Sequence, residues 1–242
     1  MPMKHLLIIS KPDTKMLKDS QLLYSLPGIN DLQVEPNFEV ERILTFIDNN
    51  ISSFCTYFYS VKDSDKENRI SDFLVHHFEN CKIEQTGGFF PYRFSKNPSQ
   101  PHSDKETDIG VFVMTRSQTP LPIIEFEAKR LSETSNNTEY VYGDRGGVER
   151  FKRGYHSPHL STCGMFGYVQ SRTSQEWIKK INSWIDTVSK SRTDLTINWT
   201  DKNEQLTKSC SFPAVEKLLS HHTRKQSNDT ITIWHYLIEL NR

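Results

Sequence analysis

The sequence carries no net charge, because its 30 lysine and arginine residues are balanced by 30 aspartate and glutamate residues. A protein that coats nucleic acid over its whole surface needs an excess of positive charge, so this class is excluded. Any contact with nucleic acid must come from a local basic patch, from metal ions or from a partner protein. The chain is not disordered either, since 35% of its residues are hydrophobic and they gather in clear segments.

Closely spaced cysteines and long apolar runs are also lacking. The cysteines are widely scattered, which supports neither zinc ligation nor a disulfide framework and favours free thiols in a reducing compartment. The first ten residues, MPMKHLLIIS, are too short for a signal peptide, and no later run is long enough to span a bilayer. We therefore expect a cytoplasmic protein without a membrane partner.

Several catalytic motifs are missing from the chain. It has no phosphate-binding loop, no G-x-S-x-G nucleophile turn and no dinucleotide-binding glycine motif. Four histidines show no spacing typical of a paired nucleophile or a metal cluster, namely His156, His159, His221 and His222. The adjacent His76 and His77 point in different directions on a helix, so one is expected to be buried and the other exposed.

The strongest pattern lies in residues 107–131, TDIGVFVMTRSQTPLPIIEFEAKRL, where a short turn separates two apolar strands. Asp108 stands at the head of the first strand. In the second, Glu125, Glu127 and Lys129 share one face because side chains alternate along a strand. Burying such a row is costly unless something compensates it, and a divalent metal would do so. Antiparallel pairing across the short turn brings Asp108 toward Glu127.

This arrangement resembles the PD-(D/E)xK nuclease superfamily, also called the restriction-endonuclease-like fold. The family motif is an acidic residue on one strand, here Asp108, and (D/E)-x-K on the next, here Glu127, Ala128 and Lys129. The resemblance implies that Asp108, Glu127 and the Ala128 carbonyl bind Mg²⁺, with Mn²⁺ as a substitute. It also implies that Lys129 serves the attacking water. Glu67 matches an acid that some members contribute from the first helix.

The resemblance covers roughly residues 66–170 and implies an α/β (α+β) fold, with a mixed central β-sheet flanked by helices. The order expected there is a helix, three strands, a crossover helix and a strand parallel to the last of the three. We assign residues 1–242 to a single domain. Residues 1–65 form an accessory N-terminal region, and residues 171–242 form C-terminal helices and a strand that pack on the core.

Hydrophobic periodicity predicts the remaining elements. Helices are expected at residues 16–26, 38–50, 66–80, 145–155, 174–189 with Ser174 as N-cap, and 212–222. Strands are expected at residues 6–10, 54–61, 82–94, 163–171 and 231–240, and a polar loop at 95–106.

Basic residues gather around the crossover helix at residues 145–155. They are predicted to contact the phosphates of a nucleic acid. The backbone amides of the neighbouring glycine pair, near the N-terminus of the helix, are an alternative anion-binding site. The four residues are Arg145, Arg150, Lys152 and Arg153. This helix lacks a Gln-x-x-x-Tyr pattern, so it does not relate the protein to the nuclease branch that carries this pattern.

The resemblance implies a Mg²⁺-dependent endonuclease acting on DNA, in restriction or antiviral defence. The neutral net charge favours an ATPase or helicase partner, and a homodimer is the other way to cut both strands. Two alternatives remain open, a catalytically silent nuclease-fold subunit that binds a partner protein and an RNA-directed nuclease. The motif also fits a solvent-facing sheet edge with Glu–Lys pairs. Glu125 is left without an assigned role, either just behind the metal ligands or exposed.

Overall fold

The computed structural model describes most of the chain after residue 37. The described residues are 38–85, 90–100, 103–114, 121–143, 145–191, 197, 199, 204–224 and 227–241. The chain divides into two units, Met1–Glu39 and Val40–Arg242, and the elements below belong to the second apart from the first two residues of one helix. The strand predicted at residues 6–10 and the helix predicted at 16–26 lie outside the described residues.

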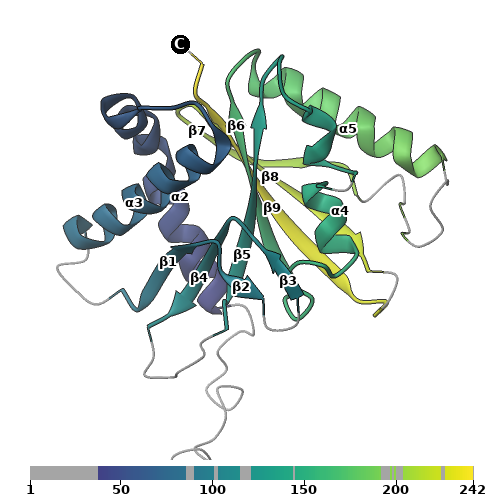
Figure 1. The fold of residues 1–242 in the computed structure, drawn as a ribbon, viewed down its shortest axis with the longest axis horizontal. Coiled ribbons are helices and arrows are strands. Elements are labelled where there is room, and N and C mark those ends of the chain that lie inside the picture. The colour runs from purple at the N-terminus through teal and green to yellow at the C-terminus, as the bar shows by residue number, and fades with distance from the viewer. Residues whose placement is uncertain are drawn as a thin grey trace, which may run out of the picture. The chain divides into compact units, whose positions relative to one another are not determined.

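A seven-stranded mixed sheet forms the centre of the second unit (Figure 1). Its strands are β1 (Tyr92–Lys96), β4 (Ile109–Val113), β5 (Ile124–Leu131), β6 (Thr162–Val169), β7 (Thr207–Phe212), β8 (Val215–Thr223) and β9 (Thr230–Glu239). They are ordered β1-β4-β5-β6-β9-β8-β7. β5, β6 and β9 run parallel to one another, and all other neighbours are antiparallel. β2 (Ser99–Gln100) and β3 (Ser103–Glu106) form a separate two-stranded ribbon.

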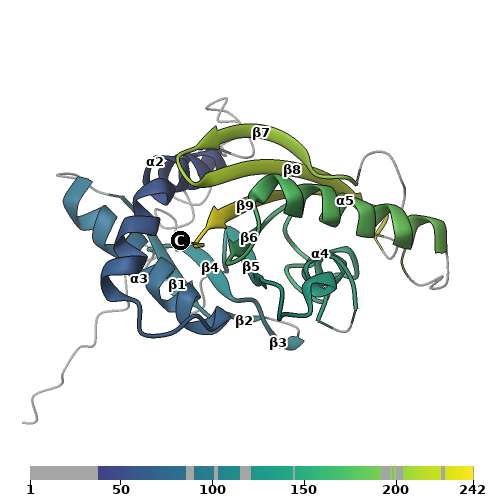
Figure 2. The same cartoon turned by 90° about the horizontal axis from the view of Figure 1, so that it is seen from above.

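Helices cover both faces of this sheet (Figures 1 and 2). One face carries α2 (Phe38–Val61) and α3 (Glu67–Gln85), and the other carries η2 (Asn137–Tyr140), α4 (Gly147–Lys152) and α5 (Ser174–Ser191). Alternation along β5 divides its side chains between two cores. Phe126 and Ala128 join the α2/α3 core, whereas Leu131 joins the α4/α5 core.

The predicted core order is confirmed. α3, β1, β4, β5, α4 and β6 follow one another in the chain, and β6 lies parallel to β5 as expected for a crossover connection. The chain is therefore a mixed α/β protein with helices on both faces of a mixed sheet. β9 does not pack onto the outside of this core. It pairs with β6 over eight residues and so lies inside the sheet.

Residues 54–61 were predicted as a strand because they are rich in aromatic residues, and this prediction is wrong. They form the last part of α2. Phe54 and Phe58 continue the helical stripe of Ile47 and Ile51, and all four side chains are fully buried. Helical spacing therefore outweighs the β-propensity of the aromatic side chains.

Three other boundaries also differ from the prediction. Residues 82–85 extend α3, so β1 starts only at Tyr92. The loop predicted at 95–106 contains β2 and β3. The helix predicted at 212–222 is instead the end of β7, a turn at Pro213–Ala214 and β8. The spacing of its apolar residues resembles that of a helix. The segment nevertheless forms a strand, because it pairs with β7 on one side and with β9 on the other.

The helix predicted at 174–189 is confirmed as α5, with a cap one residue earlier than expected. The Glu176 N–H donates to Thr173 Oγ1 at 3.3 Å, and the Glu176 carboxylate accepts from the Thr173 N–H at 3.0 Å. This reciprocal pair is a capping box with Thr173 as the N-cap. In the described part of the chain no helix is both long and apolar enough to cross a membrane, and the four cysteines are free thiols.

Candidate active site

The candidate site lies where β4 and β5 separate. Their pairing runs from Val111–Ile124 to Ile109–Phe126, and Asp108 is the next residue beyond it. Asp108 Oδ2 accepts a hydrogen bond from the Ala128 N–H at 2.7 Å. The structure thus brings Asp108 against the middle residue of the Glu127–Ala128–Lys129 segment, as the short connection between the strands predicts.

Glu67 reaches the same edge of β5 from the first turn of α3. Its Oε2 accepts a hydrogen bond from the Arg130 N–H at 2.7 Å. Alternate residues of a strand present their backbone groups to the same edge, so Asp108 and Glu67 replace a neighbouring strand at positions 128 and 130. The Ala128 carbonyl points to this edge together with its N–H. Glu67, Asp108, Glu127, Ala128 and Lys129 are referred to below as the candidate active site.

Lys129 lies between two carboxylates. Its Nζ is 3.4 Å from Glu127 Oε2 and 3.7 Å from Glu67 Oε1. Burial alone lowers the pKa of the Lys129 ammonium, but Glu127, Glu67 and Asp108 together raise this pKa above its usual value. The ammonium is therefore charged at neutral pH and fixed beside the carboxylates.

Glu127 is almost completely buried, with 1% of its surface exposed. Burial, and then the charge of Asp108, raise the pKa of Glu127 to about 8, although Lys129 and Arg150 oppose the shift. Arg150 Nη1 on α4 is 3.8 Å from Glu127 Oε2. The ionised form of this carboxyl group thus gains from any further positive charge placed next to it.

His156 was not predicted to belong to the site, yet its ring is fully buried beside Glu127. Its Nε2 is 3.2 Å from Glu127 Oε1. The chain turns back after α4 through Gly154 and Ser157, whose φ angles are 68° and 49°, and this turn returns His156 to the sheet. The signal that was overlooked is a glycine directly after a short helix, which typically ends a helix and reverses the chain.

Glu125 is fully buried, which excludes the exposed alternative. It accepts hydrogen bonds from Thr107 Oγ1 at 3.0 Å and from Ser157 Oγ. These bonds join the approach to β4, the middle of β5 and the loop that carries His156. Glu125 therefore holds together the segments around the candidate active site.

Arg224 holds the same loop from the opposite side. This side chain is 3% exposed and donates to four backbone carbonyls, those of Phe151, Ser157, Pro158 and Leu160. It also pairs with Asp229 at 3.0 Å. One guanidinium with five donors thus joins four carbonyls of this segment, of which those of the buried Phe151 and Ser157 also accept a backbone N–H. The position of His156 and Ser157 thus depends on Arg224.

Of the four predicted phosphate-binding residues, the structure places Arg150 at the carboxylates. Arg145 is exposed in the turn before α4. Arg153 is paired with Glu149 on its own helix at 2.6 Å. The prediction for Lys152 is wrong, because this side chain is 2% exposed and donates to the buried Glu204. α4 is short and turns Lys152 toward the sheet rather than toward solvent.

A buried chain of polar side chains continues from Lys152 and Glu204 across β8 and β9. Glu204 Oε2 is 3.8 Å from His222 Nδ1, and Ser220 Oγ lies within 2.8 Å of both the His222 and the His235 rings. The far end is Tyr140, whose hydroxyl is 3.0 Å from His235 Nδ1. Burial lowers the pKa of His222 and lowers that of His235 well below its usual value. Both rings are thus neutral in the folded protein at pH 7.

Replacing His235 by phenylalanine is expected to reduce the loss of stability in acid. A histidine in the unfolded chain binds a proton below about pH 6.5, whereas the buried His235 does not. The unfolded state therefore becomes more stable relative to the folded state as the pH falls. This linkage costs the wild type about 2 kcal/mol between pH 7 and pH 5, and the variant lacks it. Urea unfolding at both pH values measures the difference. The exposed His221 serves as control, because His221→Phe makes the same change of side chain outside the buried polar chain. Equal pH dependence of His235→Phe and the wild type would contradict the prediction.

The residues present fit a small divalent cation. Among the described residues no three Asp, Glu, His or Cys side chains converge as a metal-binding group, but Mg²⁺ is commonly held by one or two carboxylates together with water. Asp108, Glu127 and the Ala128 carbonyl supply such a set. In addition, no described residue makes a well-aligned hydrogen bond to the buried Glu127 Oε1, although His156 Nε2 lies 3.2 Å from it, so this oxygen has acceptor capacity that a cation would use.

Comparison with known proteins identifies no relative of this chain. No protein-family model, no curated protein and no solved structure matches the chain.

Proposed function

We propose that this protein is a Mg²⁺-dependent endonuclease that hydrolyses phosphodiester bonds of DNA at the candidate active site. The observation that carries the proposal is the position of Lys129. Its ammonium lies 3.4 Å from Glu127 and 3.7 Å from Glu67, at the point where Asp108 meets β5. Two acids and a lysine at the divergence of two strands match the arrangement that the sequence motif implies.

Asp108, Glu127 and the Ala128 carbonyl would hold the metal. When bound, Mg²⁺ polarises the phosphodiester and lowers the pKa of a coordinated water. The two carboxylates offer charge, while the Asp108 bond to the Ala128 N–H fixes the angle of its carboxylate. This leaves Asp108 Oδ1 and the Ala128 carbonyl as oxygen ligands at one edge of β5.

Lys129 and Arg150 supply the positive charge that the chain itself provides. Lys129 donates to a phosphate oxygen or orients the attacking water, because its ammonium is held close to Glu127 and keeps its charge. Arg150 approaches Glu127 from α4 and provides a second group that neutralises charge on the phosphate. Glu67 keeps Lys129 in place from α3.

The test is incubation of the purified protein with supercoiled plasmid DNA in Mg²⁺, in Mn²⁺ and in EDTA, beside the Glu127→Ala variant. We expect nicking in both metals, none in EDTA and none with the variant. Equal nicking by Glu127→Ala would reveal a contaminating nuclease. Absence of nicking by the wild type in either metal would contradict the proposal for the isolated chain. An ATPase or helicase partner would then be added before the activity is rejected, since the neutral chain has little charge of its own for DNA.

A second candidate is a catalytically silent subunit with the same fold. Asp108 and Glu67 each bond a backbone N–H of β5, and these bonds stabilise the end of the sheet without any metal. Calorimetric titration with Mn²⁺ and Ca²⁺ separates the two candidates, because a silent subunit of this kind would take up neither ion. An RNA-directed nuclease would use the same residues, and a panel of DNA and RNA substrates distinguishes it.

A further inference from the structure

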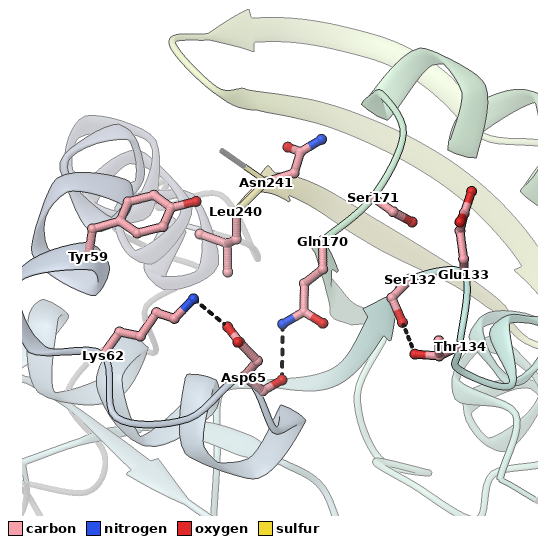
Figure 3. A pocket seen from close by; sticks show the side chains of 10 residues that line it. All are labelled: Tyr59, Lys62, Asp65, Ser132, Glu133, Thr134, Gln170, Ser171, Leu240 and Asn241. Carbon is pink, nitrogen blue, oxygen red and sulfur yellow. Dashed lines mark hydrogen bonds and ion pairs between the residues drawn. The ribbon is translucent and has the colours of Figure 1, made fainter.

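A pocket of about 460 Å³ opens at the carboxyl ends of the parallel strands (Figure 3). Its walls come from the end of α2, the α2–α3 connection and the segments that follow β5, β6 and β9. Its volume is typical of small-molecule sites, and the carboxyl edge of parallel strands is where α/β proteins commonly bind ligands. This pocket is separate from the candidate active site.

The lining residues offer no unpaired cation to a phosphate. Lys62 is the one cation among them, and its Nζ pairs with Asp65 at 2.9 Å. The second carboxylate of the lining, Glu133, is 3.5 Å from Arg172 Nη2, so the lining and its ion-pair partners are close to neutral. An anionic ligand would find no unpaired positive charge here, whereas a neutral ligand needs none.

The other lining groups suit a flat ligand with hydrogen-bonding edges. Tyr59 contributes an aromatic ring, with Lys62 Nζ over the ring at 5.8 Å from its centroid, and Leu240 gives an apolar surface beside it (Figure 3). Gln170 and Asn241 contribute amides, each with both donors and acceptors. Hydroxyl groups complete the set, from Ser132, Thr134 and Ser171. A ring face beside donors and acceptors is the combination that binds an unstacked nucleobase.

Hydrogen bonds connect the pocket with the candidate active site. The Asp65 carbonyl accepts from Gln170 Nε2 at 2.9 Å and from Arg130 Nη1 at 3.4 Å, and the Arg130 N–H donates to Glu67. Ser132, at the pocket, is three residues from Lys129 along β5 and its extension. Three residues of a strand span about 10 Å. This length corresponds to about three nucleotides at the spacing of a duplex, and to fewer nucleotides in an extended single strand.

We propose that this pocket takes an unstacked base from the same strand whose phosphodiester lies at Lys129, and that the substrate is single-stranded or locally unpaired nucleic acid. The inference rests on the proposed function. A base enters such a pocket only after it leaves the helical stack, which is free in a single strand and costly in a duplex. Because the lining offers a phosphate no unpaired cation, the strand's backbone stays outside while the base is inserted.

The experiment is equilibrium binding of fluorescein-labelled oligonucleotides, followed by anisotropy in Ca²⁺ and in EDTA. The probes are single-stranded DNA, single-stranded RNA and duplex DNA of one length. Thr134→Trp fills the mouth of the pocket, and Thr187→Trp places the same side chain on the exposed face of α5 as a matched control. Thermal unfolding verifies that both variants are folded.

We expect the wild type to bind a single strand more tightly than the duplex, and Thr134→Trp to weaken single-strand binding about tenfold, the typical loss of one stacked base. Thr187→Trp should remain within about twofold of the wild type. The DNA and RNA arms tell which single strand is preferred. Equal binding by both variants, duplex binding as tight as single-strand binding, or no binding by the wild type would overturn the inference.

The inference and the proposed function fail in different ways. If Thr134→Trp weakens binding but the wild type cuts no strand in Mg²⁺, either alone or with an ATPase or helicase partner, the base pocket stands and the nuclease assignment falls. If the wild type cuts single strands and Thr134→Trp cuts and binds them equally well, the nuclease assignment stands and the base pocket falls.

Discussion

Replacing Lys129 by methionine is expected to lower metal-dependent cleavage at least about 100-fold, the usual cost of removing a group that acts on the water or on the charged phosphate. Methionine keeps most of the length of the side chain and removes its charge. The ammonium lies between Glu127 and Glu67 and not in an apolar core, so the fold should survive. Initial nicking rates on supercoiled DNA in Mg²⁺ measure the effect.

Metal binding separates the role of Lys129 from that of the carboxylates. Lys129→Met leaves Asp108 and Glu127 in place and removes a competing positive charge, so calorimetry should show that Mn²⁺ binding is kept or tightened. Glu127→Ala should lose both Mn²⁺ binding and cleavage. Lys190→Met, at the exposed end of α5, controls for the loss of one positive charge. Cleavage by Lys129→Met at the wild-type rate would refute the assignment.

The largest expected change in stability is that of Arg224→Met. The substitution removes the donor that four backbone carbonyls and Asp229 share, at a residue that is 3% exposed. The Phe151 and Ser157 carbonyls keep a backbone N–H partner and the Asp229 side chain is 45% exposed, so the lost hydrogen bonds to the charged guanidinium together cost about 2–4 kcal/mol. For a chain of this size the midpoint of thermal unfolding should fall by about 10 °C.

The same substitution should also reduce cleavage, because Arg224 holds the loop that places His156 beside Glu127. Arg224→Lys is expected to be intermediate, since lysine keeps the charge but lacks the fork of donors. Arg172→Met removes a more exposed guanidinium whose ion pairs are at 3.5 Å and 3.9 Å, and should change stability by less than about 1 kcal/mol. Equal unfolding midpoints for Arg224→Met and Arg172→Met would show that the loop does not depend on the buried bonds.

The central part of the fold could be predicted because its signals are local. Glu125, Glu127 and Lys129 share a face by the two-residue period of a strand, and a short connection is enough to bring Asp108 beside them. From the sequence, Glu67 could be predicted only as an acidic residue at the start of a helix, a position from which some members of the family contribute an acid. Its bond to the Arg130 N–H spans 63 positions of sequence, which no local period encodes.

The features that were missed depend on tertiary contacts. Phe54 and Phe58 have high strand propensity, and only their burial against the sheet selects the helix. The strand at 215–223 has helix-like spacing and is determined by its two neighbours. His156 comes to Glu127 through a backbone reversal that Arg224 holds from 64 to 73 positions away. No alternation or periodicity within residues 145–160 contains that information.

The place of β9 has a consequence for how the chain acquires its shape during synthesis. β9 is the last described strand to leave the ribosome, yet it fills the gap between β6 and β8. Until residue 239 emerges, β6 presents an open edge of unpaired backbone groups, on a strand whose residues are all buried in the folded protein. Pairing over such a long sequence separation is slow. The nascent chain therefore passes through a long interval in which β6, the parallel neighbour of the strand that carries the candidate active site, is paired on one side only, and a chaperone that shields β6 should raise the yield of folded protein.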